Sequence, residues 1–86
     1  MTYRVLIDQR AAGKLESLPK LFAQRIDQVI VGLAVNPRPP GVKLLRGKLK
    51  EGWRVRVGRY RVLYRIDDEA REVRIFEVGH RREVYR

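Results

Sequence analysis

The chain has 86 residues and carries 20 Lys and Arg against 10 Asp and Glu, a net charge of +10 at pH 7. It has no cysteine and one histidine, which excludes disulfides and predicts that no metal or other cofactor is bound. No apolar run approaches the ~20 residues of a membrane helix, and MTYRVLID is too polar for a signal peptide. We therefore expect a cytoplasmic protein with no membrane partner. The hydrophobic content of 44% predicts one folded domain over residues 1–86.

The excess of positive charge indicates the kind of partner. Such an imbalance favours phosphate backbones or an acidic protein. Arginine outnumbers lysine in the C-terminal half, which suits bidentate contacts to phosphate. The alternative is a basic surface that serves solubility alone.

The N-terminal part predicts one strand and two helices. Residues 3–8 alternate apolar and polar side chains, as a strand does, and Asp8 is a candidate cap for a helix over residues 9–18. A second helix runs from residue 19 or 20 to 35, because an apolar stripe recurs at helical spacing: Phe22, Ile26, Val29, Ile30 and Leu33. The prolines of NPRPPG (36–41) end it.

The C-terminal part predicts three strands, at 52–57, 60–67 and 72–79, after a connecting segment. The order β-α-α-β-β-β predicts an α+β domain in which two N-terminal helices pack on a largely antiparallel four-stranded sheet. In the last strand Val73 and Ile75 are expected on one face, and Phe76 and Val78 on the other. A strand that is apolar on both faces is expected in the middle of a sheet.

The stretch GWRVRVGRYRVLYRID (52–67) predicts a hairpin. Gly58-Arg59 fits a two-residue type II′ loop, which pairs Val57 with Tyr60 and Arg56 with Arg61. One face of the hairpin is then apolar and faces the helices: Trp53, Val55, Val57, Tyr60, Val62 and Tyr64. The other face carries arginines around Leu63: Arg54, Arg56, Arg61 and Arg65.

Four arginines on one face require an explanation, because like charges directly opposite each other destabilise a sheet. Guanidinium groups that converge are favourable when an anion lies between them, and phosphate oxygens match the guanidinium fork. The sequence therefore predicts a phosphate-binding face. The alternative is that these are ordinary solvent-facing side chains.

The last residues, EVGHRREVYR (77–86), add candidates for acid–base chemistry. The ordinary pKa of His80 suits proton exchange near neutral pH. Arg81 adds a cation. Tyr85 either takes part in the reaction or packs the C-terminus onto the domain. For His80 the alternative is a polar edge residue without a chemical role.

Four segments together resemble the RelE/ParE toxin superfamily of type II toxin–antitoxin systems: VKLLRG (42–47), WRVRVGRYRVLYRID (53–67), VGHR (78–81) and EVYR (83–86). The resemblance covers essentially the whole chain and implies a RelE-like fold. Its RelE branch consists of ribosome-dependent endoribonucleases that cleave messenger RNA in the ribosomal A site. It further implies a cognate antitoxin, expected to be a small acidic or amphipathic segment.

The resemblance also implies roles for residues. Arg54 and Arg56 match two basic positions of the RelE branch, Arg61 and Arg81 match basic positions that we assign to the scissile phosphate, and Tyr85 matches a C-terminal tyrosine. Well-known members have lysine at positions 54 and 56, so proton transfer by those lysines is not available here. Arg65 is expected to bind RNA phosphates. Two alternatives stay open: a ParE-like inhibitor of DNA gyrase, and a non-catalytic RNA-binding module.

Overall fold

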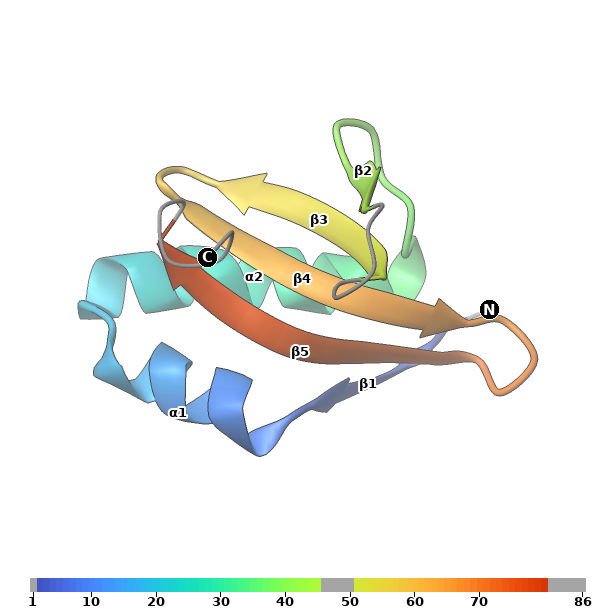
Figure 1. The fold of residues 1–86 in the computed structure, drawn as a ribbon, viewed down its shortest axis with the longest axis horizontal. Coiled ribbons are helices and arrows are strands. Elements are labelled where there is room, and N and C mark those ends of the chain that lie inside the picture. Colours follow the sequence, from blue (N-terminus) through green and yellow to red (C-terminus); the bar gives the residue numbers. More distant parts are fainter. Residues whose placement is uncertain (1, 46–50, 81–86) are drawn as a thin grey trace.

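The computed structural model describes residues 2–45 and 51–80 (Figure 1). In the described residues one strand is followed by two helices and then by four strands. The elements are β1 (Arg4–Ile7), α1 (Gln9–Ser17), α2 (Lys20–Val35), β2 (Lys43–Leu45), β3 (Gly52–Val57), β4 (Tyr60–Asp67) and β5 (Glu72–His80). None of these helices is long and apolar enough to cross a membrane.

The strands form one sheet in the order β1-β5-β4-β3-β2, with both helices on one face (Figure 1). β1 runs parallel to β5, and the other neighbours are antiparallel. This confirms the α+β fold, the central place of β5 and the predicted order of elements. The count of four strands was wrong, because Lys43–Leu45 adds a fifth at the edge. Three residues are too few to show an alternating pattern, so this strand has no clear signal in the sequence.

The helices meet the sheet through the predicted apolar stripe of α2. Ile26, Ile30 and Leu33 are buried there, and α1 contributes Ala11. Asp8 stands at the start of α1 with extended backbone, but its side chain makes no capping hydrogen bond. Its Oδ1 instead accepts a hydrogen bond from Arg74 Nη1 of β5 at 2.7 Å. The carboxylate thus ties the start of α1 to the sheet.

The hairpin of β3 and β4 has the predicted register, with Val57 opposite Tyr60, Arg56 opposite Arg61 and Trp53 opposite Tyr64. Gly58 has φ of 61°, and Arg59 is not in the left-handed region, as a type II′ loop requires. The apolar side chains of this hairpin belong to the core or pack against it, as predicted: Trp53, Val55, Val57, Tyr60, Val62 and Tyr64.

A β-bulge in β5 corrects one prediction. Leu63 pairs with Glu77 and Tyr64 with Ile75, so that Phe76 is the extra residue. The bulge returns Val78 to the helix side, where it joins Val73 and Ile75 in the core. The prediction that Val78 and Ile75 lie on different faces of the sheet was therefore wrong. The bulge adds one residue to β5, so the strict alternation of side chains does not continue beyond it.

One buried hydrogen bond connects the sheet to the loop after α2. The hydroxyl of Tyr64, which is fully buried, donates to the carbonyl oxygen of Pro37 at 2.7 Å. Burial raises the pKa of Tyr64 to about 12, so the phenol keeps its proton and remains a donor. This contact fixes the end of α2 against the centre of the sheet.

A polar cluster holds the same loop to the β4–β5 turn. Arg38 makes a bidentate ion pair with Asp68, at 3.2 Å from Nη1 to Oδ1 and 2.9 Å from Nη2 to Oδ2. The Tyr3 hydroxyl donates to Asp68 Oδ1 at 2.6 Å, and the Arg38 guanidinium lies 5.4 Å from the centre of the Trp53 ring. The hydrogen bonds from Arg38 and Tyr3 lower the pKa of Asp68 to about 2.

Replacing the buried phenol tests its hydrogen bond. Tyr64→Phe leaves the Pro37 carbonyl buried without its donor, so we expect the free energy of unfolding to fall by about 1–2 kcal/mol. Urea denaturation measures this, with Tyr3→Phe as control, since Tyr3 also loses a hydroxyl hydrogen bond but at an exposed position. An equal or smaller loss for Tyr64→Phe than for Tyr3→Phe would contradict the assignment.

The Asp68 cluster predicts a pH dependence. The pKa of Asp68 is depressed from 3.8 to about 2, so its stabilising contribution is complete above about pH 4 and is lost as the pH falls through about 2. We expect wild type to be more stable than Asp68→Asn at neutral pH, and the difference to disappear over that acid range. The control is Glu69→Gln, at an exposed position in the same turn. A difference that does not change with pH would refute the linkage.

Candidate nucleic-acid interface

The sheet face turned away from the helices is strongly basic. Strand alternation and register place on it a set that we call the basic face: Lys43, Arg54, Arg56, Arg61, Arg65 and Arg74. These six side chains come from β2, β3, β4 and β5, so four adjacent strands contribute cations to one surface. A surface of this kind suits an extended polyanion better than a single small ion.

Cations stand directly opposite one another across each pair of strands in this part of the sheet. Lys43 is opposite Arg54, Arg56 opposite Arg61, and Arg65 opposite Arg74. Each juxtaposition of like charges destabilises the sheet by a few tenths of a kcal/mol. An anion that lies over such a pair would offset this cost.

The cations differ in access to solvent. Arg56 and Arg65 are exposed and Arg54 is half-buried, whereas Arg61 is only 4% exposed. The exposed cations of the basic face are Lys43, Arg56, Arg65 and Arg74, and a phosphate contacts Arg61 only if its guanidinium becomes uncovered.

Two arginines of the basic face have different surroundings at its β5 side. Arg74 is held by carboxylates, at 2.7 Å from Asp8 and 3.6 Å from Glu72, and its hydrogen bond to Asp8 raises its pKa further. Arg65 instead lies over an aromatic ring, with its guanidinium carbon 4.1 Å from the centre of the Phe76 ring. Arg74 therefore serves the fold, while Arg65 remains available to a ligand.

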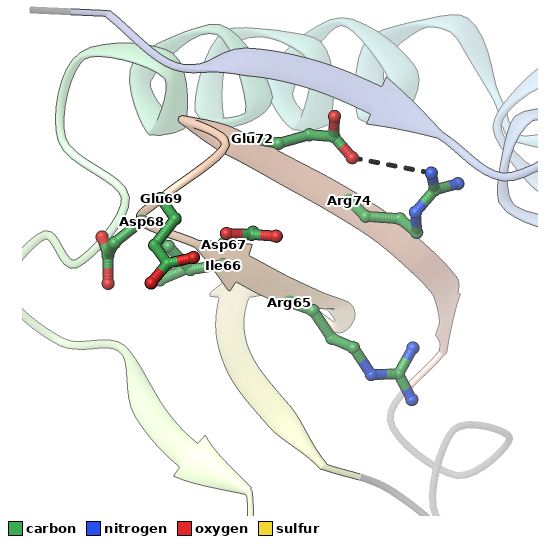
Figure 2. Close-up of a pocket in the computed structure, with 7 residues that line it drawn as sticks. All are labelled: Arg65, Ile66, Asp67, Asp68, Glu69, Glu72 and Arg74. Carbon is green, nitrogen blue, oxygen red and sulfur yellow. Dashed lines mark ion pairs between the residues drawn. The ribbon is translucent and has the colours of Figure 1, made fainter.

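Acidic residues mark the end of the basic face. A hollow of about 530 Å³ at the β4–β5 turn is lined by Arg65, Ile66, Asp67, Asp68, Glu69, Glu72 and Arg74 (Figure 2). In this view the Arg65 side chain extends away from the carboxylates of the turn, and Glu72 pairs with Arg74. Within residues 2–45 and 51–80 no group of three or more His, Asp or Glu is arranged to hold a metal ion.

The structure brings together four of the predicted site residues and separates one. Arg54, Arg56, Arg61 and Arg65 share the basic face. His80 lies opposite Tyr60 on the helix side, with ring centres 5.9 Å apart, in a group that continues to Phe22 at 5.3 Å from Tyr60. It is thus on the other side of the sheet from the arginines. Arg81 and Tyr85 lie outside the described residues.

Sequence reasoning missed two cations of this surface, Lys43 and Arg74, and one of its contacts. Lys43 joins it through β2, which was expected to be part of a connection, although its alternation with Leu44 was a weak signal. Arg74 joins it from β5, opposite Arg65. Phe76 was expected on the face opposite Val73 and Ile75, but its contact with Arg65 has no signature in the sequence. The interface is therefore broader than the hairpin, and it includes an aromatic ring.

Two helices on one face of a mostly antiparallel sheet, with a basic face opposite, form the arrangement that the resemblance to type II toxins predicts. A family model described as the ParE toxin of the type II system parDE matches residues 5–85. The chain belongs to this RelE/ParE toxin family. The matched range includes Arg81 and Tyr85.

The chain is similar to individual toxins over its full length. It is 38% identical to toxin RelG of Mycobacterium tuberculosis, over 100% of this chain and 99% of that protein. It is also 38% identical to toxin RelE of the same organism, over 98% of this chain and 87% of that protein. The chain is thus a RelE-family toxin.

Solved structures agree with this assignment. A RelBE toxin–antitoxin complex from Mycobacterium tuberculosis gives a TM-score of 0.82 at 34% identity, covering 94% of this chain and 100% of that chain. The archaeal RelE–RelB complex from Pyrococcus horikoshii also gives 0.82, at 32% identity, covering 94% and 97%. These likenesses confirm the RelE-like fold that the sequence predicted.

Arg56 allows binding and stability to be separated. Arg56→Thr removes a like-charge pair, so we expect the variant to be at least as stable as wild type. We also expect weaker binding to single-stranded RNA, with the slope of log K against log salt reduced by about 0.7 for each phosphate that is no longer neutralised. Fluorescence anisotropy and urea denaturation measure the two effects, with Arg25→Thr, exposed on α2, as control. A variant that is less stable and binds normally would show the pair to be structural.

Proposed function

We propose that this toxin is a ribosome-dependent endoribonuclease that cleaves messenger RNA without a metal ion and so inhibits translation. The observation that carries the proposal is the row of like-charge pairs on the basic face. Cations gathered over four adjacent strands suit a polyanion, and the similarity to toxins named RelE and RelG favours messenger RNA as that polyanion.

Metal-free cleavage of RNA needs three things. A 2′-hydroxyl loses its proton and attacks the phosphorus, the anionic pentacoordinate state is stabilised, and the leaving 5′-oxygen gains a proton. Arginine serves the second step well and the others poorly, because its pKa lies above ~12. We assign Arg61 and Arg81 to the scissile phosphate, and Arg54 and Arg56 to the phosphates beside it. Since Arg61 is buried, its role requires that RNA binding uncovers it.

Proton transfer to and from the RNA requires groups other than arginine. We propose Tyr85 as general base or hydrogen-bond donor, because the resemblance matches it to a C-terminal tyrosine of the RelE branch and a bound phenol beside guanidinium groups would have a lowered pKa. His80 was a second candidate, but its place beside Tyr60 is on the helix side of the sheet. For His80 to take part, it has to act around the end of β5 and not from the basic face. Tyr85 is accordingly the stronger assignment.

The arginines of the basic face are poor groups for proton transfer, and this property fits a nuclease that depends on the ribosome. A ribosome that holds the messenger strand in the A site supplies alignment, which is worth about 7–11 kcal/mol in well-oriented intramolecular reactions. We therefore propose that naked RNA is bound by the purified toxin but cut slowly or not at all.

A cognate antitoxin is the second proposed partner. The similar structures from Mycobacterium tuberculosis and Pyrococcus horikoshii are complexes of a toxin with an antitoxin, RelB in the archaeal case. A small acidic or amphipathic segment that covers the basic face would neutralise its like-charge pairs and block RNA at the same time. Inhibition and stabilisation of the toxin would then have one cause.

Inhibition of DNA gyrase is the alternative function, and the description of the matching family model as a ParE toxin favours it. The fold and the apolar strands do not separate the two activities, since both branches share them. The retention of Arg54, Arg56, Arg61, Arg81 and Tyr85 together favours RNA cleavage. A supercoiling assay with purified gyrase decides between the two functions.

Mapping of messenger RNA ends tests the nuclease directly. On induced expression of wild type we expect growth arrest and new 5′ ends within A-site codons of translating ribosomes. The double variant Arg61→Ala/Arg81→Ala should lose both. We expect its rate of cleavage to fall by about 100-fold or more, because removing one hydrogen-bond donor that stabilises the transition state has an effect of this size in other enzymes. Arg25→Ala, exposed on α2, is the control that should cut like wild type.

Other results lead to other functions. Growth arrest without A-site cuts, together with inhibited supercoiling, would replace the nuclease by a gyrase inhibitor. RNA binding without arrest in any strain would leave a non-catalytic RNA-binding module. Fast cleavage of naked RNA by the purified protein would contradict the ribosome dependence.

A further inference from the structure

We propose that Arg65 and Phe76 form a stacking platform for one RNA base next to the scissile phosphate, so that Arg65 recognises a base and not a phosphate. The inference rests on the proposed RNA-binding function. It states that the end of the basic face formed by Arg65 and Phe76 binds a base of the RNA. It replaces the phosphate-binding role that the sequence alone predicted for Arg65.

The geometry of the pair is that of a stack. The guanidinium carbon of Arg65 lies 4.1 Å from the centre of the Phe76 ring, closer than the corresponding 5.4 Å for Arg38 on Trp53 or 5.5 Å for Arg71 on Tyr3. Arg65 is exposed and Phe76 is half-buried beneath it. A guanidinium plane supported from below by a ring offers its upper side to a base.

Arg65 also differs from Arg38 and Arg74 in having no carboxylate partner among the described residues. Arg38 is engaged by Asp68, and Arg74 by Asp8 and Glu72. For Arg65 no ion pair with a carboxylate occurs within the parts of the chain that the structure describes. Its planar group is thus positioned by the ring and not by an acid.

The backbone of the neighbouring strand lies close to the stem of this side chain. Gly52 of β3 has φ of 134°, and a β-carbon there would collide with the Tyr64 carbonyl oxygen and lie 3.3 Å from Cγ of Arg65. The glycine therefore keeps the β3 side of Arg65 clear of another side chain. The close backbone of β3 helps to hold the stem of Arg65, whose guanidinium lies over Phe76.

Charge distribution indicates a base at this position. The hollow beside Arg65 is lined by four carboxylates, those of Asp67, Asp68, Glu69 and Glu72 (Figure 2). These negative charges repel a phosphate that approaches from the turn, but they do not repel a neutral base, whose amino groups they attract. The RNA backbone then follows the arginines nearer the hairpin loop, and one base reaches Arg65.

The distance along β4 fits a nucleotide beside the cleavage point. Arg61 and Arg65 lie on one face of the same strand, separated by Leu63, which is fully buried. Four residues of strand span about 13 Å. A base on Arg65 therefore belongs to a neighbouring nucleotide, and stacking there positions the phosphate near Arg61.

The test is an abasic scan. Short unstructured RNAs that each lack one base are titrated against the purified toxin by fluorescence anisotropy. Wild type should lose about fivefold or more in affinity at one position, as expected when a stacked base is removed. Arg65→Lys keeps the charge and loses the plane, and Phe76→Leu keeps an apolar side chain and loses the ring. Both variants should bind intact RNA more weakly and show no penalty at that position.

Controls separate this proposal from the proposed function. Arg71→Lys, which alters an arginine stacked on Tyr3, should retain the wild-type penalty. If Arg56→Thr weakens binding but Arg65→Lys and Phe76→Leu keep the penalty, the platform is wrong and the RNA-binding function stands. If Arg65→Lys binds like wild type while Arg65→Gln lowers the salt slope, Arg65 contacts a phosphate and the proposal fails. A wild type that binds no RNA also overturns the platform, whatever the mapping of messenger ends shows.

Discussion

The pairing of β3 with β4 determines both faces of this molecule. Once Val57 stands opposite Tyr60, alternation sends every second side chain of both strands toward the helices and the rest toward solvent. A shift of one residue would bury arginines and expose the aromatic rings, so the apolar side chains fix the register strongly. The same register then places Arg56 opposite Arg61. The core and the basic face are two consequences of one arrangement.

This arrangement could be predicted from the sequence because the patterns that specify it lie within short segments. A two-residue loop with glycine first and an uninterrupted alternation over residues 52–67 specify the hairpin, and the stripe of α2 specifies what covers it. The features that were missed depend on contacts between distant segments. The bulge at Phe76 is settled by how β5 fits Leu63 and Tyr64, and β2 is too short to form a pattern.

The same limit applies to the candidate site. Arg54, Arg56, Arg61 and Arg65 follow from the alternation, but the burial of Arg61 and the stack under Arg65 do not. Nor does the sequence reveal that His80 faces the helices, because the parity of β5 changes at the bulge and the ring meets Tyr60. Residue type thus indicated a phosphate-binding surface, while the structure divided its members into accessible, buried and stacked arginines.

Three acidic residues stabilise the fold through ion pairs that do not involve the exposed arginines of the hairpin. The carboxylates of Asp8, Asp68 and Glu72 each hold a cation that joins distant segments, namely Arg74, Arg38 and Arg4. They gather near β1 and the β4–β5 turn, away from the hairpin loop. The Tyr64–Pro37 hydrogen bond adds a neutral tie at the centre. Acids that were instead placed opposite Arg56 or Arg65 would strengthen the sheet and would also neutralise the surface on which RNA is proposed to bind. These three ion pairs thus stabilise the fold by joining distant segments, and none of them involves the exposed Arg56 or Arg65.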